Sequence, residues 1–331
     1  MGYAGVSLVE QAMAVPLRRR CCPLAWVSLV LAADESVLVC VEGVEVVAVG
    51  CGRAYGVATA YAALVVWTGA TAVSVRVHAL RTRVTPAGWP SAYLGRTSYA
   101  SITLTHLVEF ERNVVPTGPM GGIVDVQGAV AVAGGGVLEA VVIGVPVSGT
   151  LSLPVYVGPW PAGETTLAVP DYGGDGFHVA ARGAIGGQDA SAWASFATGE
   201  AFELLVPAPP VPVSPAVDAP GVTTATPFTV FEDGALARQF HWLPTITGSA
   251  PVVSVTTART TAYLPDVAAL GMSLVVGNNY FWEAASIDAA DLATAARVAG
   301  VDIFATGAGG PGPETRAAMA AGPSRRFTLA P

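Results

Sequence analysis

Short β-type runs separated by glycine and proline constrain the fold of this chain more than any other feature. Between residues 95 and 206 they include "SYASITLT", "LSLPVYVG", "ETTLAVP" and "AFELLVP". In the first run, Ile102 and Leu104 alternate with Ser101 and Thr103, which is the period of two of a strand. Short strands spaced about 10–12 residues apart are typical of all-β sandwiches and barrels. We therefore expect residues 95–206 to form a β-sandwich.

A proline-rich segment, "PAPPVPVSPAVDAP" at residues 207–220, follows these runs. Proline fixes its own φ angle and has no N–H to donate, so such a segment tends to be extended and semi-rigid. We expect residues 207–220 to be a linker between the first sandwich and a second domain at residues 221–331.

The second domain contains the spacing of a tyrosine corner. In "SLVVGNNYFW", Leu274 precedes Tyr280 by six residues, with Gly277 between them. In a Greek-key sandwich, a tyrosine at the start of a strand can hydrogen-bond back to the corner before it. We expect Leu274, Gly277 and Tyr280 to form this corner, with Trp242 and Trp282 in the core beneath it.

These residues resemble the fibronectin type III family, in which leucine is followed by Pro-Gly and then tyrosine. Val276 stands where the family has proline. Trp242 resembles the B-strand tryptophan of the family, and "SRRFTLAP" at 324–331 resembles its closing G strand. The layout is similar to fibronectin-type repeats in surface lipoproteins of high-GC bacteria. The resemblance covers residues 221–331 and implies an Ig-like, extracellular adhesion, scaffold or binding module.

A long insertion, at about residues 287–322, departs from this family pattern. The sequence from Asp288 to Ala299 predicts a short helix with Asp288 as its N-cap. Function on a β-sandwich is carried mainly by its loops. The insertion is therefore a candidate binding element; the alternative is a decoration without function.

Residues 1–94 read as an apolar leader. Arg18–Arg20 precede an uncharged apolar run at residues 21–33, the pattern of a secretory signal with cleavage just before Asp34. Because the chain has several methionines, a start upstream of the native one is an alternative explanation of this region. An ordinary folded region is a third.

Two further segments of the leader could attach the chain to a membrane. "VVAVGCG" resembles a lipoprotein lipobox and makes Cys51 a lipidation candidate. Residues 54–75 contain no charge and are long enough to cross a bilayer as a helix, although they could equally form two buried strands. We therefore expect a signal, a lipid anchor or a membrane anchor in residues 1–94.

Charge and cysteine content exclude several classes of protein. The net charge is −8 and no lysine is present, which argues against a nucleic-acid partner. The cysteines lie within the first 51 residues, so the rest of the chain has no thiolate or disulfide chemistry. Their spacing is not that of a zinc site.

The segment "PDYGGDGFH" is the main candidate for chemistry. It places Asp171, Asp175 and His178 in a glycine-rich turn. The two carboxylates are weak metal candidates, because a hard cation needs six or more oxygen ligands. The alternative is a hairpin turn, in which Asp-Gly is favoured. With no hydrolase, P-loop or dinucleotide motif in the chain, we expect no catalytic residues and no cofactor.

These features predict an all-β protein of two Ig-like or fibronectin type III-like sandwiches, a proline-rich linker and an apolar leader. We expect a non-catalytic protein of the bacterial cell envelope, surface-anchored or secreted, that binds a protein or glycan. One alternative is a glycan-binding accessory module, which requires exposed aromatic or polar rings at Tyr172, His241 or Trp242. The other is a hydrolase without a readable motif, which requires a cleft with His178 beside Asp171 or Asp175.

Overall fold

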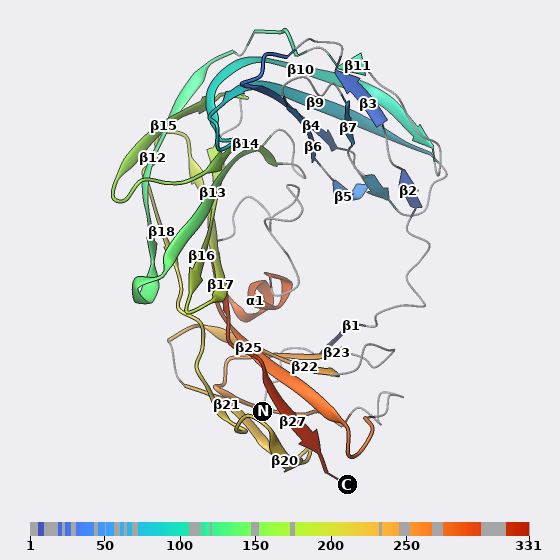
Figure 1. Ribbon diagram of the computed structural model, residues 1–331, viewed down its shortest axis with the longest axis vertical. Helices are drawn as coiled ribbons and strands as arrows, with labels where there is room; N and C mark the ends of the chain where they lie inside the picture. Colours follow the sequence, from blue (N-terminus) through green and yellow to red (C-terminus); the bar gives the residue numbers. More distant parts are fainter. Residues whose placement is uncertain are drawn as a thin grey trace.

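The computed structural model is built of β-strands in several sheets, with one α-helix, α1 (Leu292–Val298), among the residues that it describes (Figure 1). The chain is therefore all-β in class, as the sequence predicts. The described residues are 6–9, 19–21, 24–27, 31–42, 46–49, 51–55, 60–62, 65–67, 72–105, 113–114, 116–119, 121–146, 152–172, 176–231, 234–244, 252–266, 274–298 and 316–330.

The largest sheet has eleven strands and contains residues from both halves of the chain. Nine of them follow one another in the order β1 (Val6–Val9), β23 (Val252–Thr257), β22 (Ala237–Pro244), β25 (Asn279–Ala289), β26 (Ala317–Ala321), β17 (Gln188–Ala197), β16 (Gly176–Ile185), β13 (Val137–Pro146) and β14 (Ser152–Gly158). The other two are β27 (Arg325–Leu329), which pairs with β25, and β20 (Ala219–Val222), which pairs with β27.

Five smaller sheets complete the described structure. A four-stranded sheet has the order β10 (Pro90–Thr105), β9 (Ala72–Val84), β4 (Glu35–Glu42) and β6 (Cys51–Tyr55). The three-stranded sheets are β15 (Thr165–Pro170), β12 (Ile123–Val132), β18 (Phe202–Val206); β19 (Pro212–Ser214), β21 (Pro227–Val230), β24 (Thr261–Tyr263); β11 (Asn113–Val114), β3 (Leu24–Val27), β7 (Ala60–Ala62); and β2 (Arg19–Cys21), β8 (Val65–Trp67), β5 (Val46–Val49).

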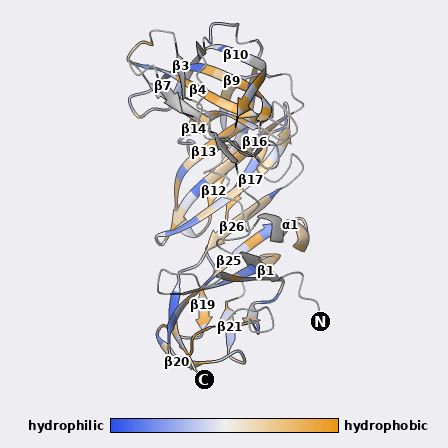
Figure 2. Ribbon diagram, turned by 90° about the vertical axis from the view of Figure 1, so that its right-hand side faces the viewer, coloured by the Kyte–Doolittle hydropathy of each residue, from blue (hydrophilic) through white to orange (hydrophobic). Residues whose placement is uncertain are grey.

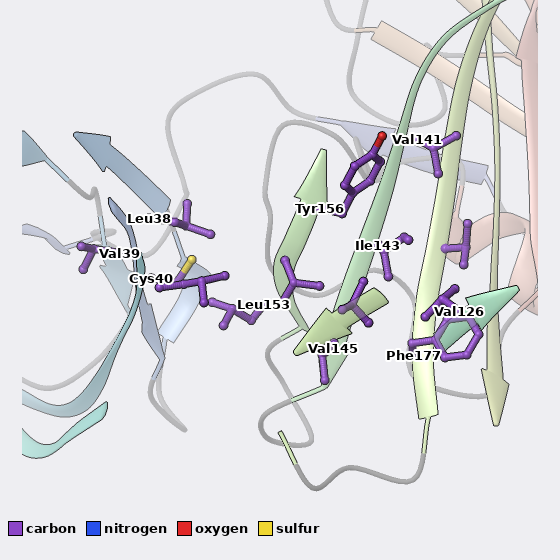
Figure 3. Close-up of a cluster of buried hydrophobic side chains, with 14 of the residues drawn as sticks. Leu38, Val39, Cys40, Val126, Val141, Ile143, Val145, Leu153, Tyr156 and Phe177 are labelled. Carbon is purple, nitrogen blue, oxygen red and sulfur yellow. The ribbon is translucent and has the colours of Figure 1, made fainter. Parts of the chain in front are cut away.

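One hydrophobic core joins the four-stranded sheet to the strands of the middle of the chain. On β9, Val73, Val75 and Val77 are buried and alternate with exposed Ser74 and Arg76, as the pleat of a strand requires. Figure 3 shows side chains of β4 lying opposite those of β13 and β14 within this core. The buried set that links these strands includes Leu38, Cys40, Val145 and Leu153.

This shared core corrects the predicted extent of the leader. The expected boundary at residue 94 falls inside β10, which runs from Pro90 to Thr105. Residues 54–75 contribute to short strands and to the start of β9, so their described part follows the strand alternative. No helix in the described part of the chain is long and apolar enough to span a membrane.

A second core lies between the three-stranded sheet β19-β21-β24 and the strands β22, β23, β25 and β27. Phe228 of β21 is fully buried at its centre. Its ring lies 5.2 Å from that of Trp242, 5.4 Å from that of Trp282 and 5.4 Å from that of Phe327, in edge-on arrangements that aromatic pairs favour. Trp242 lies on β22, two strands along the chain from β19, and not on the second strand, where the resemblance placed it.

The proline-rich segment is not a free spacer. Its strand β19 pairs with β21, and β20 pairs with β27, so both belong to the C-terminal sheets. The Arg325 guanidinium also donates hydrogen bonds to the carbonyls of Pro212, Val213 and Pro215. Proline lacks a backbone donor but keeps its carbonyl, so side-chain and edge-strand pairing can still fix such a segment.

Strand β26 makes the large sheet continuous across the two halves of the chain. It lies between β17 and β25 and pairs antiparallel with both (Figure 2). The predicted insertion therefore provides a structural strand in addition to its helix. The N-cap is Asp291, whose carboxylate accepts the N–H of Thr294 at 2.7 Å; the predicted cap, Asp288, belongs to β25.

Candidate functional site

A pocket of about 340 Å³ opens where the four-stranded sheet meets two loops of the middle region. Its floor comes from β9 and β10, and its walls come from residues 116–119 and 171–172. Its lining combines one cation, two hydroxyl side chains, an imidazole and a phenol: Arg96, Thr97, Ser98, His78 and Tyr172, together with Gly118 and Pro119.

Two glycines allow the wall of this pocket to approach its floor. A Cβ atom on Gly95 would lie 2.5 Å from the carbonyl oxygen of Pro116, and one on Gly118 would lie 2.5 Å from that of Arg96. Real side chains do not fit at such distances, so the close approach requires glycine. The Arg96 N–H then donates to the carbonyl of Gly118 at 3.2 Å and holds the two segments together.

The guanidinium of Arg96 is held in place from two sides. It donates a hydrogen bond to the carbonyl oxygen of Asp171 at 2.6 Å. It also lies 4.4 Å above the centre of the Tyr172 ring, a cation–π distance. Because the planar guanidinium has five donors, these contacts fix its orientation without using all of its N–H groups.

Burial raises the pKa of Tyr172 to about 12, against the opposing effect of the Arg96 guanidinium. The phenol is therefore neutral at physiological pH and does not compensate the charge of Arg96. No carboxylate is among the residues that line the pocket. The pocket is therefore locally cationic in a chain of net charge −8.

His78 and Ser98 face each other across β9 and β10, with Nδ1 and Oγ 2.9 Å apart. The same arrangement occurs at two other places in the described chain. His178 hydrogen-bonds Ser195 at 2.6 Å, and His241 hydrogen-bonds Ser254 at 2.7 Å, each across neighbouring strands. A cross-strand His–Ser pair is thus a recurrent way in which this fold satisfies a half-buried or buried imidazole.

The residues expected to carry metal or hydrolytic chemistry do not form one cluster in the described structure. Asp171 borders the Arg96 pocket through its carbonyl, whereas the hydrogen bond of His178 runs to Ser195. Asp175 lies outside the described residues. No group of three or more His, Cys, Asp and Glu side chains placed to hold a metal ion occurs in the part of the chain that the structure describes.

The three residues of the expected tyrosine corner lie together before β25. The Tyr280 hydroxyl accepts the N–H of Val275 at 2.8 Å. Leu274 packs on the core to which Tyr280 belongs. Gly277 has a φ of 80°, a left-handed conformation that favours glycine, and donates its N–H to the carbonyl of Leu329.

The rings required for a glycan-stacking platform do not lie in an exposed row. Trp242 is only 2% exposed and Trp282 is fully buried, so both are core residues. His241 is half-buried and bonded to Ser254 and Gln239. One face of Tyr172 is covered by Arg96. The aromatic-platform form of the glycan alternative is therefore contradicted by the burial of Trp242.

The lipidation prediction at Cys51 is corrected by a disulfide between Cys40 and Cys51. A sulfur atom that is bonded to Cys40 cannot also carry a lipid thioether. Cleavage before Cys51 would in addition remove β4, which lies between β9 and β6. Cleavage at the earlier predicted point, before Asp34, would remove Leu31, which is buried in the first core.

Comparisons with known proteins add little to this description. No family model matches the chain, and no curated protein matches it. Among solved structures, the FN1–FN3 domains of chicken CNTN1 align with 93% of this chain and 100% of their own, at 8% identity and a TM-score of 0.20. A TM-score this low carries no argument about fold or function.

The sequence analysis did not identify the Arg96 pocket. Its residues come from four separate places in the chain, and none belongs to a recognisable motif. The available signal was local: glycines at 95 and 118, each of which stands beside a segment that the fold brings into close contact.

Proposed function

We propose that this chain is a non-catalytic binding protein of the cell envelope, surface-attached or secreted. The observation that carries the proposal is the Cys40–Cys51 disulfide, which joins the neighbouring strands β4 and β6. Structural disulfides form and persist in oxidising compartments and are rare in the bacterial cytosol. The disulfide supports export independently of where a signal segment is cleaved.

Residues 212–330 are proposed to be a fibronectin type III-type sandwich with an insertion. Support comes from strand order. The sheets β19-β21-β24 and β23-β22-β25-β27 follow the arrangement of a seven-stranded Greek-key sandwich, in which the first, second and fifth strands form one sheet. The hydrogen bond between Tyr280 and Val275 at the corner before β25 is further support. Modules of this kind act as scaffolds that display binding surfaces.

A binding role rather than a catalytic one is favoured by the chemistry of the pocket. Its lining has a fixed cation and hydroxyl groups that can orient a ligand. Proton transfer to a bond in a substrate needs an acid or base with a group that orients it. The His78–Ser98 pair recurs at His178 and His241 outside this pocket, which supports a structural role for it.

Cell fractionation combined with thiol labelling tests this proposal. The chain, with a C-terminal tag, is expressed in a GC-rich bacterial host, and each fraction is treated with a maleimide reagent before and after reduction. The proposal expects the protein in the envelope or medium, with Cys40 and Cys51 labelled only after reduction. A cytosolic product with intact Met1 and both thiols labelled without reduction would show that the protein is not exported.

A further inference from the structure

We propose that the Arg96 pocket binds a small organic carboxylate, of the size of one acidic sugar residue. The inference deepens the proposed binding function and rests on it, since it names the class of ligand that the site recognises. It follows from the charge, the donors and the size of the pocket.

Charge selects an anion. Arg96 is the one ionic side chain among the seven residues that line the pocket, and Tyr172 stays neutral because of its raised pKa. A cation without a lining carboxylate favours a ligand that brings one negative charge. A single guanidinium matches a carboxylate better than a phosphate dianion, which is usually held by more than one cationic or backbone donor.

Geometry selects a planar acceptor. The bond from Arg96 to the carbonyl of Asp171 and the contact with the Tyr172 ring fix the plane of the guanidinium before any ligand arrives. A fixed guanidinium pairs with the two oxygens of a carboxylate through parallel hydrogen bonds. Because the side chain is already ordered, little conformational entropy is lost when the ligand binds.

The hydroxyl groups add donors beside the cation. Ser98 is exposed and Thr97 is half-buried, and both line the pocket. When Nδ1 of His78 carries the proton, it donates to Ser98 Oγ, and the Ser98 O–H is then available to a ligand oxygen. The pair therefore adapts to an acceptor through a change of tautomer, without movement of the backbone.

Size limits the ligand to a small molecule. The volume of about 340 Å³ is at the lower end of the range for ligand pockets, roughly 300–1,000 Å³. It exceeds what a bare acetate or sulfate ion needs. A single sugar ring with a carboxylate fills such a space and presents hydroxyls to the carbonyl groups of the wall at Gly118 and Pro119.

Calorimetric titration of the purified, oxidised full-length protein tests the inference. The probe is D-glucuronate, and D-glucose is the neutral control of the same ring. We expect glucuronate to bind and glucose to bind at least tenfold more weakly, since the sugars differ only in the carboxylate. Equal affinity of the two sugars, or no heat with glucuronate, would overturn the inference.

Variants with matched controls locate the binding. Arg96→Lys keeps the charge but removes the planar fork, and it should weaken glucuronate about tenfold or more. Arg83→Lys, an exposed arginine of β9 paired with Asp34, is the control and should change nothing. If Arg96→Lys does not fold, Ser98→Ala serves, with an expected loss of about threefold to tenfold; Ser91→Ala, on the same strand, is its control. Unchanged affinity in a folded Arg96→Lys or Ser98→Ala variant would refute the assignment.

A competition with sodium sulfate separates an organic carboxylate from any bare oxyanion. The inference expects sulfate to displace glucuronate only at a concentration at least tenfold above that of unlabelled glucuronate. Displacement at equal concentration would overturn it. Because the titration uses purified protein, its outcome is independent of export: a cytosolic protein that binds glucuronate contradicts only the proposed location, and an exported one that does not bind contradicts only this inference.

Discussion

The hydroxyl of Tyr280 lies 2.8 Å from the backbone nitrogen of Val275 and accepts its hydrogen bond. The tyrosine ring is almost fully buried and stacks against Phe327, with the ring centres 5.8 Å apart. One side chain thus contributes to the core and satisfies a backbone donor at the corner before β25. Buried backbone groups without a partner are costly, so the hydroxyl has a structural purpose.

Replacement of Tyr280 by phenylalanine removes this hydrogen bond and keeps the ring. We expect the free energy of unfolding to fall by about 1 kcal/mol or more, because the Val275 N–H loses its partner. Urea denaturation followed by fluorescence measures the change. Tyr263→Phe is the control, since Tyr263 is 45% exposed on β24 and should be neutral. Equal stability of the Tyr280→Phe variant and the natural chain would exclude a stabilising corner.

Phe228 is the centre of the C-terminal core, with three aromatic rings within 5.4 Å of its own. Phe228→Ala leaves a cavity among residues that cannot close around it, and we expect a loss of about 3–5 kcal/mol. The matched control is Phe231→Ala, three residues along the chain, where the ring is 67% exposed and the loss should stay within about 0.5 kcal/mol. Thermal unfolding of both variants gives the comparison; similar losses would place Phe228 outside the core.

Local patterns were sufficient to predict the strands and the position of the corner, because the spacing of Leu274, Gly277 and Tyr280 lies within one turn and one strand. The partner of each strand is a different matter. An uncharged run such as residues 54–75 has the same composition whether it enters a membrane or a sheet, so hydropathy alone cannot assign it. The pocket depends on the register of β9 and β10 and on two distant loops, and no local spacing encodes that contact.

The joining of the two halves illustrates the same limit. β26 is composed of alanines and one methionine, a composition with low strand propensity. It is a strand because β17 and β25 offer it edges on both sides. The insertion was expected to be a loop and helix outside the sheets; tertiary pairing overrides the local preference at residues 317–321.

Loss of the disulfide should destabilise the four-stranded sheet. Cys40 is fully buried, and its loop to Cys51 spans 11 residues in sequence separation. Closure of a loop of this length stabilises a fold by about 2–3 kcal/mol. We expect a Cys40→Ala, Cys51→Ala double variant to unfold at a lower denaturant concentration than the oxidised natural chain.

A reducing agent provides the control for that experiment. Dithiothreitol should lower the midpoint of the natural chain and leave the double variant unchanged, since the variant has no disulfide at this position to reduce. If both proteins respond equally, another cysteine pair accounts for the effect, and the bond between Cys40 and Cys51 is not the stabilising one.

Two histidines predict how stability depends on pH. Burial lowers the pKa of His178, which hydrogen-bonds Ser195. Burial also lowers the pKa of His241, although the charge of Glu283 opposes this. Below the ordinary histidine pKa of about 6.5, the unfolded chain therefore binds more protons than the folded chain. The contribution of both side chains to stability is complete above that pH and decreases as the pH falls from 6.5 toward the folded pKa.

Replacement of each histidine by glutamine tests this sign. Glutamine cannot titrate, so the free energy of unfolding of His178→Gln and of His241→Gln should fall less between pH 7 and pH 5 than that of the natural chain. The double variant should show the smallest dependence, and what remains reports the other titrating groups. Urea denaturation at a series of pH values measures the slopes. Identical slopes in all four proteins would mean that neither imidazole is held neutral by burial, whereas a steeper slope in the variants would reverse the direction of the pKa shift.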